Sequence, residues 1–140
     1  ELLADALVRY SASDAGIDTG NLRDDLVQVY GHSYGIGNHV IQAAMQEILS
    51  NVRQHLDWLE QFVPGRITQR RAAARALFDR ALARGEIAPP AELNLVMDLV
   101  PALLLHGFNT RGQKVSRASI ARCVDGVLMP LLHAGGGHGR

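Results

Sequence analysis

Histidine is the residue type in this chain with the widest chemistry, because its imidazole can bind a metal or move a proton near neutral pH. The sequence holds six histidines, but no two of them stand four residues apart. None has a cysteine or glutamate at a spacing typical of metal ligands. We therefore predict no metal site and no cofactor. The six residues are His32, His39, His55, His106, His133 and His138.

The nucleophilic side chains lack the neighbours that catalysis needs. Cys123 is the one cysteine, so no internal disulfide forms, and Arg122 is the one cation in the turn before it. We expect a buried, unreactive thiol. Ser33 and Ser116 have no accompanying His-Asp relay, and no glycine-rich phosphate loop is present. We therefore predict that the protein is not an enzyme.

The charge balance argues against nucleic acid as a direct partner. The 14 basic and 14 acidic side chains cancel, and no basic face is available to release counterions from a phosphate backbone. No apolar run reaches the roughly 18 residues of a membrane span, and no signal peptide is apparent. We expect a cytoplasmic protein that has no membrane segment.

The composition and the spacing of apolar residues indicate that the site is positioned by helices. Apolar residues make up 47% of the chain and aromatics only 5%, and the apolar residues recur with the period of a helix rather than a strand. We predict an all-α bundle of about six to seven helices at residues 1–134, with a flexible tail at 135–140. The expected helices cover residues 1–12, 22 to a glycine-broken segment at 31–37, 40–49, 52–62, 66–84, 91–108 and 116–132. For the third and fourth of these, one continuous helix stays open as an alternative.

Several helix ends are marked by specific residues. Asn21 is a good N-cap with Asp24 at the third helical position. Gly85 follows the arginine-rich helix, where a glycine commonly ends a helix. Ser116 is a second N-cap, with Val115 and Ile120 spaced to contact one another across it.

The two C-terminal helices carry more apolar surface than one core can cover. Between residues 93 and 105 only Asn94 and Asp98 are plainly polar, so that helix must be covered on two sides. A monomer would expose an unusually large apolar patch. We predict a two-fold homodimer joined by residues 91–108 and 116–132 of each subunit. The predicted interface residues are Val96, Val100, Leu103, Gly107, Val124, Val127, Leu128 and Leu131.

Five segments together resemble one protein family. They are ELL at residues 1–3, DTGNLRDDL at 18–26, RRAAARALFDRALARGEI at 70–87, LVMDLVPALLLHGF at 95–108 and ASIARCVDGVLMPLL at 118–132. In this order and spacing the whole chain resembles the C-terminal, ligand-binding and dimerisation domain of the tetracycline-repressor (TetR/AcrR) family of transcriptional regulators. In that family residues 1–12 would connect to an N-terminal helix-turn-helix head, which would lie before Glu1.

The resemblance implies a ligand cavity inside the bundle and places several segments around it. Such cavities are mostly apolar, with a few polar groups that orient the ligand. The implied ligand-binding residues are Tyr30, Tyr34, His39, Met45, Trp58, Phe62, Leu104 and His106, and ordinary core packing stays open as the explanation for each of them.

The function predicted from the resemblance is that of a ligand-responsive transcriptional regulator, most often a repressor. A small, apolar effector would bind this domain, and operator DNA would be bound only by the head. Two alternatives stay open: a helical oligomerisation or protein-interaction module without a small ligand, and a small α-helical enzyme. A closed bundle without a cavity would favour the module, and a polar cluster with a perturbed titrating group would favour the enzyme.

Overall fold

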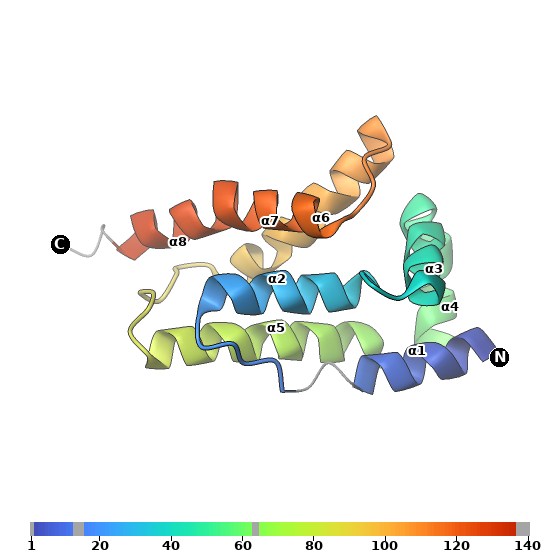
Figure 1. The fold of residues 1–140 in the computed structure, drawn as a ribbon, viewed down its shortest axis with the longest axis horizontal. Helices are drawn as coiled ribbons and strands as arrows, with labels where there is room; N and C mark the ends of the chain where they lie inside the picture. Colours follow the sequence, from blue (N-terminus) through green and yellow to red (C-terminus); the bar gives the residue numbers. More distant parts are fainter. Residues whose placement is uncertain (1, 13–15, 63–64, 137–140) are drawn as a thin grey trace.

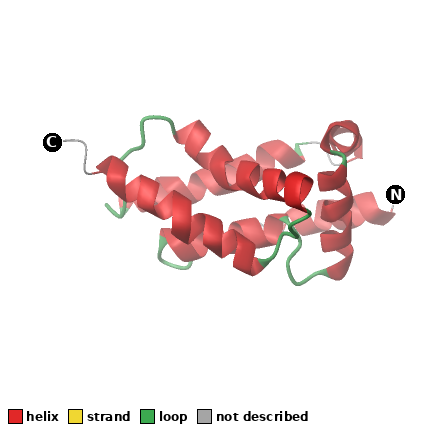
Figure 2. Cartoon of the chain, turned by 90° about the horizontal axis from the view of Figure 1, so that it is seen from above, coloured by secondary structure: helices red, strands yellow, loops and turns green. Residues whose placement is uncertain are grey.

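The computed structural model describes residues 2–12, 16–62 and 65–136. Within these ranges the chain is built from helices and loops, with no strand, as Figure 2 shows. The predicted all-α class is therefore confirmed. The elements are α1 (Leu2–Ala12), α2 (Leu22–Ser33), α3 (His39–Ser50), α4 (Val52–Phe62), α5 (Arg66–Ala83), α6 (Leu93–Arg111), α7 (Arg117–Cys123), the π-helical turn η1 (Val124–Leu128) and α8 (Met129–Gly136).

Side-chain caps fix the start of α2 as the sequence predicts. The Asn21 side chain accepts a hydrogen bond from the Asp24 amide at 2.8 Å and donates to the Asp24 carboxylate at 3.0 Å. The Leu22 amide, another donor left free by the helix start, donates to Glu86 Oε1 at 2.8 Å. Glu86 follows α5, so this bond holds the start of α2 beside the end of α5.

A tight turn separates α2 from α3. Gly35 has φ +76°, and a Cβ at this position would lie 2.6 Å from the Gln42 amide nitrogen, so the turn requires glycine. Only Asn51 separates α3 from α4, and its non-helical backbone conformation ends the first helix. Residues 39–62 therefore form two helices, as predicted, and not one continuous helix.

The limits of α5 and α6 differ in how well the sequence predicts them. Helix α5 ends at Ala83, and Gly85 follows with φ +71°, as predicted. Helix α6 begins at Leu93, later than the predicted residue 91, because Glu92 takes the cap position and Pro90 stays in the preceding loop. It also runs past residue 108 to Arg111, where Gly112 in a left-handed conformation ends it.

The last helical segment contains an irregularity that the sequence analysis missed. Ser116 and Ser119 form a reciprocal capping box at its start, and Val115 and Ile120 are both buried there, as predicted. Further along, the Met129 amide donates to the Val124 carbonyl in a π-type bond. Pro130 has no N–H for the Gly126 carbonyl and would crowd it, and a widened turn relieves this conflict. The helical segment then continues to Gly136. The rest of the predicted tail, residues 137–140, lies outside the described residues.

Figure 1 shows α2 and α5 side by side and antiparallel at the centre, with α7, η1 and α8 lying along α2. Helices α3 and α4 stand across one end, and α1 lies against α5 near them. Most buried residues form one cluster, here the main core, to which α2, α5, α6, α7 and η1 contribute. A second group, here the N-terminal cluster, consists of Leu7, Ile41, Met45 and Ile48, with Ala6, Tyr10 and Trp58 packed against it.

Candidate functional site

A pocket of about 290 Å³ lies where the two buried clusters meet. We call it the seam pocket, because Met45 and Ile48 on one wall belong to the N-terminal cluster, whereas Tyr34 and Leu49 belong to the main core. The volume is near the lower end of the range of roughly 300–1,000 Å³ that is typical of small-molecule sites. Its lining residues are Tyr34, Met45, Ile48, Leu49, Val52, Leu56, Ile67, Arg70, Asp98, Pro101, Ala102 and Leu105.

Helix period explains why these elements contribute the apolar wall. Met45, Ile48 and Leu49 follow one another at spacings of three and one residues, which places them on one side of α3, and Val52 adds to the wall at the start of α4. Pro101 and Leu105 are four residues apart on α6 and face them. The wall is thus formed by elements far apart in the sequence.

Three polar side chains reach this otherwise apolar pocket. Tyr34 is 4% exposed, and burial raises the pKa of its phenol, while the nearby Arg70 charge acts in the opposite direction. The phenol is therefore neutral at physiological pH. Asp98 forms an ion pair with Arg71, and Asn94 accepts a hydrogen bond from the same guanidinium at 3.4 Å. Arg70 makes no hydrogen bond or ion pair with another of the described residues.

Tyr30 lies behind the pocket rather than in it. Its side chain is buried in the main core, and its hydroxyl donates to the Met97 carbonyl at 3.3 Å. Burial raises the pKa of this phenol as well. The residue therefore holds α2 against α6 at the back of the pocket wall.

The structure brings together only part of the predicted ligand-binding set. Tyr34 and Met45 line the seam pocket. Trp58 packs against the N-terminal cluster beside it, and the Phe62 side chain lies outside the described residues. Leu104 is buried but faces a different groove.

Two predicted histidines lie away from the pocket. His39 is exposed at the first position of α3. His106 is also exposed, because it lies about 100° around α6 from Leu105 and so faces another side of the helix. Arg70 and Asp98 also line the pocket and were not among the predicted site residues. Their places in amphipathic patterns gave no signal that a pocket would reach them.

A second apolar surface, on α6, η1 and α8, is open to solvent. Leu95, Leu103, Val127 and Leu131 are 66, 37, 42 and 49% exposed. With the half-buried Leu99 we call them the outer α6–α8 face. Two grooves run along it, one of about 360 Å³ beside Leu95 and Leu131 and one of about 380 Å³ beside Leu103 and Val127.

This surface corrects the predicted interface set. Leu103, Val127 and Leu131 are exposed on it and Val96 is half-buried. Three of the remaining predicted residues belong to the main core of the chain itself, and Gly107 is covered by the side chains of Arg111 and Gln113. The three core residues are Val100, Val124 and Leu128. Cys123 borders one groove, is half-buried rather than buried, and burial raises the pKa of its thiol.

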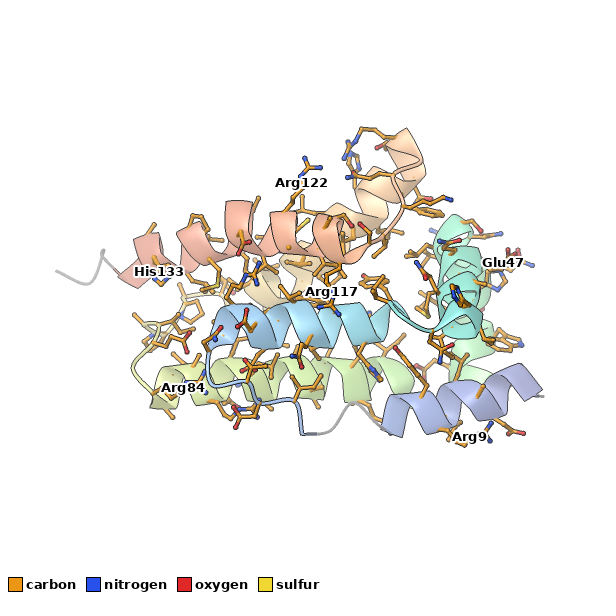
Figure 3. The ribbon with its side chains drawn as sticks, in the orientation of Figure 1. Arg9, Glu47, Arg84, Arg117, Arg122 and His133 are labelled. Carbon is orange, nitrogen blue, oxygen red and sulfur yellow. The ribbon has the colours of Figure 1, made fainter. Side chains whose placement is uncertain are left out.

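In Figure 3, Glu47 on α3 points away from the bundle and Arg122 lies on the outer side of α7. Among the described residues, no three His, Cys, Asp or Glu side chains gather where they could hold a metal ion. No helix in the described part of the chain is long and apolar enough to cross a membrane.

The comparison with known families agrees with this architecture. Residues 17–127 match the family described as tetracyclin repressor-like, C-terminal domain, and the chain therefore belongs to that family. The predicted resemblance is thereby confirmed.

Three curated relatives share the same degree of similarity. They are uncharacterized HTH-type transcriptional regulators, one from Mycobacterium bovis and two from strains of Mycobacterium tuberculosis. Each is 28% identical over 123 residues, which is 82% of this chain and 56% of the relative. The chain thus spans about half the length of these relatives. No solved structure matches it.

Proposed function

We propose that this chain is the effector-binding and dimerisation domain of a ligand-responsive transcriptional repressor, and that a small, largely apolar effector occupies the seam pocket. The observation that carries the proposal is the double role of Met45 and Ile48. Both side chains line the pocket, and both belong to the cluster that buries Leu7 of α1. A molecule entering the pocket therefore contacts the residues on which α1 rests.

This arrangement supports a population-shift mechanism. A ligand that fits one packing of Met45 and Ile48 better than another shifts the equilibrium toward that packing. Because Leu7 is completely buried against the same residues, each packing favours its own position of α1. The coupling requires no chemical step, and we propose no catalytic role for the domain.

Operator DNA enters the proposal through the relatives. Their names describe them as HTH-type regulators, and they extend well beyond the part that this chain matches. We propose that a helix-turn-helix outside residues 1–140 binds the operator and that α1 transmits the state of the pocket to it. The chain has a formal net charge of zero, which argues against direct binding of this domain to DNA.

The outer α6–α8 face supports a homodimer. Its apolar side chains come from two helices and η1 and are contiguous with the two grooves. Burying this face against a second copy would remove it from water and would set the distance between two DNA-binding heads. A cytoplasmic location follows from access to DNA and belongs to the same proposal.

The alternative of an interaction module without a ligand explains the outer face but leaves the seam pocket without a role. A small enzyme would need a catalytic group in that pocket. Its polar side chains are a neutral phenol, an arginine and an ion-paired aspartate, and these suit ligand orientation better than proton transfer.

The decisive experiment uses the complete regulator. Native mass spectrometry and a ligand screen by thermal shift would identify molecules that bind, and fluorescence anisotropy at fixed salt would measure operator affinity with and without them. We expect a bound molecule to lower operator affinity. Leu7→Ala should reduce this effect by about 2- to 30-fold while leaving ligand affinity nearly unchanged.

Val8→Ala is the matched control, because Val8 neighbours Leu7 on α1 but is exposed. It should leave both ligand affinity and the effect on operator binding unchanged. If no bound molecule alters operator affinity, the repressor mechanism is wrong. If Leu7→Ala and Val8→Ala change the ligand effect on operator affinity equally, the proposal that α1 transmits the state of the pocket is wrong.

A further inference from the structure

The charges at the seam pocket do not cancel locally. Arg70 and Asp98 both line it, on α5 and α6. The Asp98 carboxylate is already paired with Arg71, the residue that follows Arg70 on α5. No ion pair joins Arg70 to any residue in the described part of the chain. The pocket wall therefore carries one positive charge that no described residue balances with an ion pair.

A second polar group points to the same kind of ligand. The Tyr34 side chain is more than nine-tenths buried and lines the pocket with Arg70. Its hydroxyl makes no hydrogen bond to another described residue. Burial raises the pKa of the phenol, so it is protonated and can donate. The pocket thus presents a cationic donor and a neutral donor, and neither has an acceptor in the described part of the chain.

We propose that the seam pocket binds a small apolar carboxylic acid in its ionised form. The carboxylate accepts hydrogen bonds from the Arg70 guanidinium and the Tyr34 hydroxyl, and the hydrocarbon part lies against Met45, Leu49 and Leu105. This assignment rests on the proposed function, in which the same pocket takes the effector.

Other ligand classes fit the charges less well. A cationic amphiphile would need a carboxylate without an ion-pair partner. The one carboxylate that lines the pocket, Asp98, already forms an ion pair with Arg71. A neutral apolar molecule would cover the half-buried Arg70 without giving it an acceptor, and a charged group that is desolvated without a partner is costly. Guanidinium groups match carboxylates in both charge and shape.

Isothermal titration calorimetry with three matched probes tests the assignment. Octanoate, octanol and octylammonium share one hydrocarbon chain and differ in charge, and each is titrated into the 140-residue chain at neutral pH and fixed salt. We expect octanoate to bind at least tenfold more tightly than octanol, and octylammonium to bind more weakly still. Hexyl to dodecyl members of each series cover the dependence on length.

Arg70→Gln should weaken octanoate binding about 10- to 100-fold, the range expected for losing a charge-assisted hydrogen bond. Octanol binding should change little. Arg75→Gln is the matched control, because Arg75 lies on the same helix but is exposed and faces Asp79 at 3.9 Å. Arg70 has no hydrogen-bond or ion-pair partner among the described residues, so a thermal melt of Arg70→Gln should match that of the unmodified chain.

The outcomes separate the two proposals. Equal binding of octanol and octanoate, or tighter binding of octylammonium, would overturn the carboxylate assignment and leave the effector pocket in place. A preference for octanoate that persists in Arg70→Gln would also overturn it. If no member of any series binds, both the assignment and the effector pocket are wrong.

Discussion

The Tyr30 hydroxyl donates a hydrogen bond to the carbonyl oxygen of Met97, 3.3 Å away, and thereby joins α2 to α6. Pro101 stands four residues after Met97 inside α6 and has no N–H. The Met97 carbonyl consequently lacks its normal helical donor. A side chain from a neighbouring helix supplies the missing hydrogen bond at the wall of the seam pocket.

Tyr30→Phe should therefore lower the free energy of unfolding by about 1–3 kcal/mol, because it leaves a buried carbonyl without a donor. In a Pro101→Ala background the new amide can bond to the Met97 carbonyl, so the same substitution should cost less. Urea unfolding of the four proteins measures this difference. An identical loss in both backgrounds would show that Tyr30 acts through packing alone.

The buried phenols of Tyr30 and Tyr34 should make the folded protein less stable at alkaline pH. Burial raises the pKa of Tyr30 and Tyr34 above the ordinary value, so the folded protein keeps these protons after the unfolded chain has lost them. Their contribution is fully present below the unfolded-state pKa of about 10 and declines as the pH rises beyond it, by up to about 1.4 kcal/mol per pH unit for each group.

Urea unfolding between pH 8 and pH 11 would measure this decline, with the Cys123→Ala variant as the background so that the thiol does not titrate. Tyr34→Phe should make the decline above pH 10 shallower and leave the slope below pH 9 unchanged. Tyr34 is the suitable position, because its hydroxyl has no hydrogen-bond partner among the described residues that the substitution would remove. Parallel curves throughout would contradict the prediction.

The sequence predicts the order and type of the helices well, because local signals determine them. Asn21 and Ser116 are caps whose side chains bond to amides three residues further on, and such contacts depend only on neighbouring residues. The π-helical turn was missed for a different reason. Pro130 could end a helix, bend it or widen one turn, and only the surroundings of η1 select among these outcomes.

The site is less predictable than the helices. Helix period gives the direction of a side chain around the helix axis, but it does not say which other element covers that side chain. Helix period places Arg70 among the polar residues of α5, yet α1, α2 and α6 all pack on α5, and the pocket reaches Arg70. Val100 and Leu103 both lie on the apolar helix α6, but one faces the main core and the other faces outward. The sequence contains no signal that distinguishes them.

Asp25 should contribute strongly to stability, because it fastens the loop before α2 to α5. Its carboxylate is completely buried and accepts hydrogen bonds from the Thr19 amide at 2.6 Å and the Thr19 hydroxyl at 2.7 Å. Nη2 of Arg80 and of Arg84 each lie 4.0 Å from its Oδ2. Asp25→Ala should lower the free energy of unfolding by about 3 kcal/mol, measured by urea unfolding.

Asp79→Ala is the matched control for Asp25→Ala. Asp79 also faces an arginine of α5, at 3.9 Å from Arg75, but both side chains are exposed. Exposed pairs contribute little, so this substitution should change the free energy of unfolding by no more than about 0.5 kcal/mol. If the two variants lose similar amounts of unfolding free energy, burial does not strengthen the contacts of Asp25.

The final prediction concerns the outer α6–α8 face. If it joins two subunits, the interface should bury roughly 2,000 Å² or more, and a charge at its centre should separate them or cause aggregation. Val127→Glu makes this change on η1, whereas Val40→Glu places the same charge on α3, where Val40 is also exposed but lies away from that face. Analytical ultracentrifugation should find dimers for the unmodified chain and Val40→Glu, and monomers or aggregates for Val127→Glu. An unmodified chain that sediments as a monomer at micromolar concentration would eliminate the dimer, and with it the mechanism that positions two DNA-binding heads.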